Sequence, residues 1–254
     1  MNNLTKTALI CLALITPSIV LADPIKVTHE PIDYFNIGSS DQSAGKLTYI
    51  GGLEIESEDK SFGGFSGLRI SSDGKRLYSV SDTSLWLTAE IKRDEKDKII
   101  ALSKTNLSCL CRANGSPYGS KHWGDAEGLE IAGKSAYVVF ERLNRINIYP
   151  IKADLTPGKP KQATASFKPF KVSYSEGLEA LALAPKASPL AGKFIAIAEE
   201  SLNAKGQNRA FIADAKTITE FAIARDSDYS VTDATFLPDG DLLILERRVG
   251  LSVG

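Results

Sequence analysis

The sequence predicts an all-β chain whose hairpins form a β-propeller of about four to six blades, in a complete or an open ring. Three observations support this prediction. Short runs of β-forming residues alternate with turn signals, and almost no helical periodicity is present. Four segments share one pattern of two apolar strands around a turn. Their starts recur at intervals of about 50 to 60 residues, which fits propeller blades better than the alternative, a β-sandwich.

Each repeated segment begins with a polar or acidic residue, continues as an apolar strand, turns, and ends its second strand at an acidic residue. Asp73-Gly74 and Asp239-Gly240 mark two turns, because glycine supplies the positive φ of a tight turn without strain. Gly133 marks another turn, and a longer Pro/Gly loop marks the remaining one. Each segment is therefore predicted to be a β-hairpin. The segments are residues 65–82, 126–141, 175–200 and 231–247.

The N-terminal residues predict export. Lys6 precedes a mostly apolar run that ends at Ala22, so residues 1–22 have the pattern of a signal peptide. The run is shorter than the roughly 20 residues that a membrane-spanning helix needs, and Pro17 interrupts it. We therefore expect residues 23–254 to form one mature domain, periplasmic or secreted, without a membrane association after cleavage.

Composition narrows the classes of partner. The chain has 254 residues, 43% of them hydrophobic, which is enough for a full core. Its formal net charge is -1, and no run of lysine and arginine is present, so nucleic acid is not an expected partner. Specific binding is therefore expected to depend on local clusters of side chains.

Two cysteines remain after removal of the signal peptide, Cys109 and Cys111. In a strand their side chains would share one face with Cα atoms about 6.5 Å apart, near the upper limit for a disulfide. An oxidising compartment permits that bond, and two thiols without a role are the alternative. A lone C-x-C is too little for a zinc site.

Acidic residues mark both ends of the predicted hairpins. A hairpin brings its first and last residues to the same open end, and in a propeller these ends gather on one face. Close like charges are unfavourable without cations among them, and Ca²⁺ is a hard cation that carboxylate oxygens bind. Alternatively, Arg142, Arg145, Arg247 and Arg248 could neutralise the carboxylates or receive an anionic substrate group. The carboxylates expected to converge are those of Asp82, Glu127, Glu141, Glu176, Glu199, Glu200, Asp233 and Glu246.

Several ordered motifs resemble one known family. They are YIGGLEI, FGGFSGLRISSDGKRLYSVSD, DAEGLEI, FERLNRINIY, EGLEALA and TDATFLPDGDLLILERR. Together they are similar to the phytase-like domain of exported bacterial proteins, the esterase-like activity of phytase family, over most of residues 45–248. The resemblance implies a propeller similar to the calcium-dependent β-propeller phytases, acting on a small-molecule phosphate ester or another ester. Similar sequences continue for another blade or two after LERR, so we expect this chain to be C-terminally shortened.

The resemblance also implies site residues. We expect catalytic roles for Glu127, Glu176 and Arg145, with calcium as the cofactor. Family members often carry a histidine just before the arginine, where this chain has Asn144. The positions expected to bind metal are Asp82, Asp125, Glu127, Glu141, Glu176, Glu179, Asp233 and Glu246.

Three other readings of these residues stay open. A serine-type carboxylesterase would use Ser66 with His122 and an acid, although Gly-Phe-Ser-Gly is one residue short of the usual elbow and lacks its strand-turn-helix context. A non-catalytic propeller would bind a small ligand or a protein partner on the same face. Individual carboxylates could also simply cap turns by accepting backbone N–H groups.

Overall fold

The structure is a computed structural model that describes residues 23–35, 38–226 and 228–248, and within them the chain is almost entirely strand and loop. The helical residues described form one turn of α-helix, α1 (Lys121–Gly124), and one 3-10 turn, η1 (Lys168–Phe170). The predicted all-β class is therefore confirmed.

Four antiparallel sheets follow one another along the chain, each built mainly from consecutive strands. The first contains, in spatial order, β1 (Asp23–Pro24), β9 (Ile99–Cys109), β8 (Leu85–Arg93), β7 (Arg76–Ser81) and β6 (Phe65–Ile70). The second contains β10 (Ala126–Ala132), β11 (Ser135–Phe140), β12 (Arg145–Pro150) and β13 (Lys161–Gln162). The third contains β14 (Leu178–Leu183), β15 (Phe194–Leu202), β16 (Asn208–Ala213) and β17 (Ile218–Ile223). The fourth pairs β18 (Ser230–Phe236) with β19 (Leu242–Arg247).

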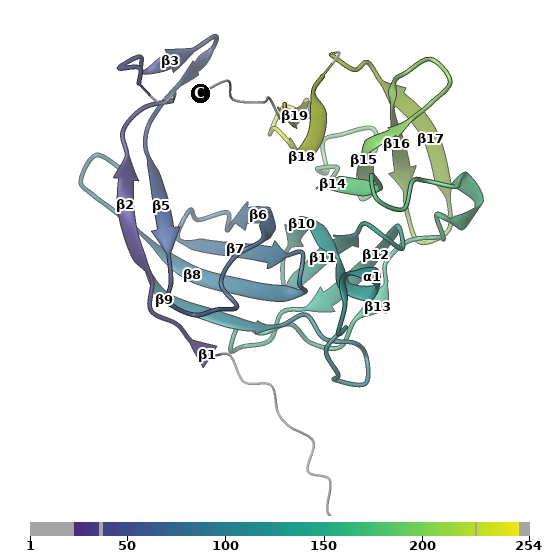
Figure 1. Ribbon diagram of the computed structural model, residues 1–254. Coiled ribbons are helices and arrows are strands. Elements are labelled where there is room, and N and C mark those ends of the chain that lie inside the picture. Colours follow the sequence, from purple (N-terminus) through teal and green to yellow (C-terminus); the bar gives the residue numbers. More distant parts are fainter. Residues whose placement is uncertain (1–22, 36–37, 227, 249–254) are drawn as a thin grey trace, which may run out of the picture.

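An N-terminal arm adds two small sheets to these four. They pair β2 (Thr28–Ile32) with β5 (Gly52–Glu56) and β3 (Ser43–Ala44) with β4 (Leu47–Thr48). In Figure 1 the arm rises beside the first sheet, with β3 at its tip. The repeat pattern did not predict this arm, because its strands lie outside the four repeated segments.

The four predicted hairpins are present as β6–β7, β10–β11, β14–β15 and β18–β19. Their turns contain glycines with positive φ: 71° at Gly74, 59° at Gly133 and 97° at Gly240. In the longer loop before β15, Gly192 has a φ of 77°. The turn signals therefore located these connections correctly.

The first strands of the four hairpins, β6, β10, β14 and β18, lie next to one another in chain order and line the inner side of the molecule (Figure 1). Two glycines allow their backbones to approach. A Cβ added at Gly67 would lie 2.7 Å from the carbonyl oxygen of Glu127, and one at Gly128 would lie 2.5 Å from that of Glu179. The glycine of the repeated S-G-L and E-G-L motifs is thus required by contact between neighbouring sheets. This arrangement of sheets is consistent with a propeller-like fold.

The hydrophobic core lies between successive sheets. Trp86 and Phe140 are fully buried in one cluster between the first and second sheets. Phe211 packs with Val139 between the second and third sheets, and Val231 packs with residues of β14 and β15 between the third and fourth. Burial of apolar surface between the sheets thus stabilises the side-by-side arrangement of β6, β10, β14 and β18.

A buried arginine also connects the four first strands. The Arg69 guanidinium on β6 donates to Asp233 on β18, with Nη1 2.6 Å from Oδ2, and Nε lies 3.6 Å from a carboxylate oxygen of Glu130 on β10. Its Nη2 donates at 2.7 Å to the carbonyl oxygens of Leu181 on β14 and Ala234 on β18. Arg69 therefore contacts all four sheets at once.

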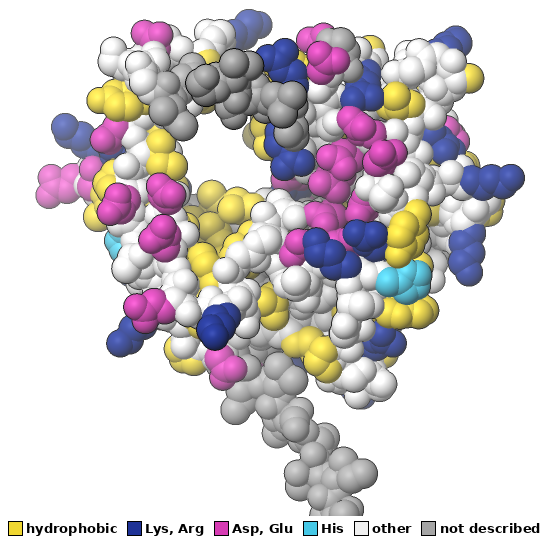
Figure 2. All heavy atoms as spheres, viewed as in Figure 1, with side chains coloured by type: hydrophobic (Ala, Val, Ile, Leu, Met, Phe, Trp, Pro, Cys, Tyr) yellow, Lys and Arg dark blue, Asp and Glu magenta, His cyan; other side chains and the backbone are white. Residues whose placement is uncertain are grey.

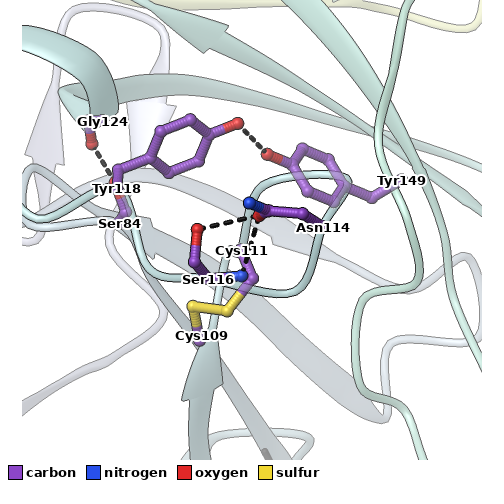
Figure 3. Close-up of a disulfide and its surroundings, with 8 residues drawn as sticks. All are labelled: Ser84, Cys109, Cys111, Asn114, Ser116, Tyr118, Gly124 and Tyr149. Carbon is purple, nitrogen blue, oxygen red and sulfur yellow. Dashed lines mark hydrogen bonds between the residues drawn. A yellow bond between two sulfur atoms is a disulfide. The ribbon is translucent and has the colours of Figure 1, made fainter. Parts of the chain in front are cut away.

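A disulfide joins Cys109 and Cys111 (Figure 3), which resolves the alternatives that the sequence left open. Their Cα atoms are 5.1 Å apart, closer than a continuous strand would place them. The reason is that β9 ends at Cys109 and the chain turns, with the Leu110 N–H donating to the carbonyl oxygen of Ser84. The bond closes the start of the loop that leads to α1.

Replacing both cysteines with serine is expected to lower the free energy of unfolding by about 1–2 kcal/mol, because the crosslink closes a very short loop. The melting temperature should fall by roughly 3–6 °C for a chain of this size. Reductant should cause the same fall in the unmodified protein and none in the double variant. A reductant effect that persists in the variant would contradict this assignment.

Within the described ranges, no helix is long and apolar enough to cross a bilayer. The predicted signal peptide, residues 1–22, lies outside the described residues, so export stays a prediction.

Candidate metal and active site

A β-bulge interrupts the first strand of each hairpin at the same place. The pairing shifts between Phe65 and Leu68 in β6 and between Ala126 and Leu129 in β10. It shifts again between Leu178 and Ala180 in β14, and between Val231 and Asp233 in β18. A bulge leaves its extra residue outside the ladder and redirects that side chain. The side chains placed in this way are Ser66, Glu127, Glu179 and Thr232.

One position near the open end of each hairpin, in or just after its second strand, also recurs. Asp82 and Glu141 donate their backbone N–H groups to the carbonyl oxygens of Gly64 and Asp125, each at 2.9 Å. Glu199 donates to the residue just before β14 in the same way and at the same distance. In the fourth hairpin this place belongs to Arg247, opposite Ser230. The repeat therefore places acidic side chains at the open ends of three hairpins and a basic one at the fourth.

Bulge residues, open-end residues and Asp125, which directly precedes β10, form two groups of three carboxylates. One consists of Asp125, Glu127 and Glu141, and the other consists of Glu141, Glu179 and Glu199. In each group one oxygen per residue lies within 4.8 Å of the others, so that each group could hold a metal ion. Glu141 belongs to both. Figure 2 shows acidic side chains gathered on this face, bordered by lysine and arginine side chains.

Burial and mutual repulsion raise the pKa values of these carboxyl groups. Burial, followed by the charge of Asp125, raises the pKa of Glu127 to about 8, although the Ser66 side chain opposes the shift. Burial also raises the pKa of Glu179 to about 9, with repulsion from Glu127 and Glu199 adding to it. The pKa of Glu141 is raised for the same reasons, against a hydrogen bond from the Gly177 N–H. Without an added cation, these carboxyl groups are therefore partly protonated near neutral pH.

The residues fit a bound cation. Asp125 is 2% exposed, and its Oδ1 is buried without a hydrogen-bond partner, while Oδ2 accepts from Arg142 Nε at 2.6 Å. Two other cationic groups lie at the border: Lys121 Nζ is 4.0 Å from Asp125, and Arg247 Nη2 is 3.6 Å from Glu199. A buried anionic oxygen without a partner is costly, and a hard cation among the carboxylates would supply the missing partner.

Four residues expected to bind metal lie outside both groups. Asp82 pairs with Lys121, whose Nζ is 2.6 Å from its carboxylate. Glu176 is exposed in the loop before β14, and Glu246 lies on β19 opposite Val231. Asp233 is paired with Arg69, because it follows the bulge of β18 instead of occupying it. The structure therefore brings together fewer carboxylates than the sequence predicts, and these four are not among them.

Arg145, expected to be catalytic, supports α1. Its Nη2 donates to the carbonyl oxygen of Trp123, and its guanidinium stacks 4.0 Å from the centre of the Phe140 ring. Asn144 has a φ of 43° and accepts from the Leu178 N–H at 2.9 Å, so it fixes the start of β14. Both residues hold the site in place without contacting either group of carboxylates through a side-chain hydrogen bond in the described residues.

The serine hydrolase alternative receives no geometric support. His122 Nδ1 forms a hydrogen bond with the Tyr174 hydroxyl at 2.7 Å, and the Ser66 side chain lowers the pKa of Glu127 by hydrogen bonding. Among the described residues, no hydrogen bond joins Ser66 to His122.

Sequence reasoning placed Glu199 at the open end but left it out of the ligand set. The signal was available, because Glu199 directly follows an apolar run, residues 194–198, as Glu141 follows residues 136–140. Lys121 was not singled out, because no sequence pattern links it to Asp82, 39 residues earlier.

The family profile described as "Esterase-like activity of phytase" matches residues 60–254. The chain belongs to the phytase-like family. The match spans both groups of carboxylates and confirms the resemblance found in the motifs. Membership in the phytase-like family supports a hydrolase-type function for the chain.

Solved structures give weaker similarities to this phytase-like chain. A candidate 6-phosphogluconolactonase from Bacteroides uniformis shares 17% identity with a TM-score of 0.34; the match covers 68% of this chain and 47% of that one. The phytase-like chain thus spans about half the length of that protein. A luciferin-regenerating enzyme shares 11% identity with a TM-score of 0.36, covering 69% of this chain and 80% of that one. No curated protein sequence matches significantly.

Proposed function

We propose that the protein is an exported hydrolase that cleaves small-molecule phosphate esters with the assistance of calcium. One observation carries this proposal: two groups of three buried or half-buried carboxylates share Glu141 on one face, with an unpartnered anionic oxygen on Asp125. Membership in the phytase-like family supports the hydrolase class.

Asp125, Glu127 and Glu141 would hold one calcium ion, and Glu141, Glu179 and Glu199 would hold a second. Bound calcium would supply positive charge for phosphate oxygens and lower the pKa of a bound water. Among the three residues predicted to be catalytic, Glu127 alone belongs to this site. Glu176 and Arg145 lie outside it.

The basic residues at the border favour an anionic substrate. Lys121 lies near Asp125, and Arg247 lies near Glu199. A hydrogen bond with the Asp82 carboxylate raises the pKa of Lys121 above its ordinary value, so this side chain stays a cation. Both cations can attract a phosphate group toward a site that calcium has neutralised.

We further propose that the four hairpin sheets correspond to propeller blades and that the mature protein acts in the periplasm or outside the cell. The order of β6, β10, β14 and β18 supports the assignment of blades, and the N-terminal sequence pattern supports export.

The test uses residues 23–254 with and without millimolar Ca²⁺, and a generic aryl phosphate as substrate. Ca²⁺ at about 100 times its dissociation constant should raise the melting temperature by roughly 5–10 °C, reversibly with chelator. Glu141→Gln should lower the calcium affinity by about 10–100-fold, since it removes a ligand of both groups. The rise in melting temperature and the turnover should therefore both be smaller at the same Ca²⁺ concentration. Glu95→Gln, at an exposed hairpin tip, should change neither.

Three outcomes would contradict the proposal. Ca²⁺ stabilisation without turnover would favour the non-catalytic ligand-binding alternative. Calcium-independent cleavage of carboxylic esters that is lost in Ser66→Ala would favour the serine-type carboxylesterase. Neither stabilisation nor turnover would show that the carboxylates do not form a calcium site.

A further inference from the structure

Three aromatic rings form an exposed surface beside the carboxylates. His122 and Trp123 belong to α1, and Tyr174 belongs to the segment before β14. The ring centres of His122 and Trp123 are 4.6 Å apart, and those of His122 and Tyr174 are 5.8 Å apart. Trp123 and Tyr174 are 46% and 47% exposed, although large aromatic side chains usually bury most of their surface. We call these three residues the aromatic shelf.

Several contacts hold the aromatic shelf in place without covering it. The Tyr174 hydroxyl bonds His122 Nδ1 at 2.7 Å, which connects the two chain segments. The Arg112 guanidinium lies 5.4 Å from the centre of the Trp123 ring, and Arg145 Nη2 bonds the Trp123 carbonyl oxygen. Rings that are already fixed lose little conformational entropy when a ligand stacks on them.

Arg142 connects the aromatic shelf to the carboxylate site. The Arg142 guanidinium lies 5.2 Å from the centre of the Tyr174 ring, while its Nε donates to Asp125. Lys121 begins the same helical turn that carries His122 and Trp123. In Figure 2 a histidine and apolar side chains lie next to the basic side chains that border the acidic group. A molecule spanning a few ångströms could therefore contact both regions.

We propose that the aromatic shelf binds the alcohol part of the substrate and that this part carries a planar aromatic ring. This inference rests on the proposed function, because the phosphate end of the same ester would occupy the carboxylate site. Stacking on Trp123 or Tyr174 recognises a flat π surface, and nearby Arg142 and Arg112 keep the rings oriented. The shelf thus selects aryl esters over alkyl esters of the same phosphate group.

Two non-hydrolysable probes test this inference, phenylphosphonate and methylphosphonate, each titrated by calorimetry into residues 23–254 with saturating Ca²⁺. Phenylphosphonate should bind about five- to tenfold more tightly, as expected for one stacked ring. It should also quench tryptophan fluorescence, because Trp123 is exposed whereas Trp86, the other tryptophan, is 1% exposed. Methylphosphonate should leave the fluorescence unchanged.

Variants test which side chains cause the preference for phenylphosphonate. Trp123→Ala and Tyr174→Ala should each reduce the preference for phenylphosphonate toward one while preserving methylphosphonate binding. Tyr174→Phe should retain most of the preference, since it keeps the ring. Tyr34→Ala removes a tyrosine that is 46% exposed near the N-terminal arm and should have no effect.

The outcomes separate this inference from the proposed function. Equal binding of both probes without quenching would overturn the aromatic shelf alone. Failure of both probes to bind in the presence of Ca²⁺ would overturn the shelf together with the phosphate ester function.

Discussion

Replacing Arg69 with methionine is expected to lower the free energy of unfolding by about 3–5 kcal/mol, since it removes one partner from a buried ion pair. The side chains of Arg69, Asp233 and Glu130 are only 11%, 22% and 15% exposed. Without the guanidinium, two carboxylates lose a cationic partner and three backbone carbonyl oxygens lose a donor. The melting temperature should fall by roughly 6–20 °C.

Lys104→Met provides the control for the Arg69 variant. Lys104 pairs with Glu90 at 2.8 Å, but its side chain is 74% exposed, so water screens the pair and the loss of stability should be far smaller than for Arg69→Met. Replacing Asp233 and Glu130 by their amides in the Arg69→Met background should recover part of the stability, because the unpaired charges are then absent. A fall no larger than that of Lys104→Met would show that Arg69 does not connect the sheets energetically.

The melting temperature of the calcium-free protein is expected to fall as the pH rises from about 5 to 9. Glutamates titrate near 4.5 in the unfolded chain, whereas Glu127 and Glu179 have folded-state pKa values of about 8 and about 9. Since these pKa values are raised on folding, the stability they confer is present below about pH 4.5 and is lost as the pH rises through 8 and 9. We expect a fall of roughly 5–10 °C in chelator, corresponding to about 2–3 kcal/mol.

Calcium and one variant check the origin of this pH dependence. Saturating Ca²⁺ should make the fall smaller, because the cation compensates the charges that appear. In chelator at pH 9, Glu179→Gln should melt at a higher temperature than the unmodified protein, and its response to Ca²⁺ should be weaker. Glu95→Gln should follow the unmodified protein throughout. If Glu179→Gln lowered the melting temperature at pH 9, repulsion among the carboxylates would not be the cause.

The hairpins were predictable from the sequence because their signals are local. Gly74, Gly133 and Gly240 occupy turns in which positive φ is required, and the apolar runs beside them become paired strands. The N-terminal arm has no such repeat to mark it. The disulfide was left open, because the end of β9 at Cys109 depends on a bond between Leu110 and Ser84 that no local pattern specifies.

The site was predictable only in part, because bulges change which residue of a repeated motif points into the site. Glu127 in E-G-L occupies a bulge, whereas Glu176 in the matching motif lies before β14 and Glu179 takes the bulge position instead. Asp233 fails for the same reason, one residue beyond its bulge. Counting residues from a turn cannot reveal an extra residue in one strand, so the acidic pattern overestimated the number of converging carboxylates.

The order of strands within the sheets has a consequence for folding kinetics. Strands β10 to β13 and β14 to β17 pair with sequence neighbours, so each sheet can form through short loop closures. Glu141 and Glu179, in contrast, come together only when the second and third sheets dock. During refolding, calcium binding by the group that contains Glu141, Glu179 and Glu199 should therefore lag behind the far-ultraviolet circular dichroism signal, and the cation would report the docking of these two sheets.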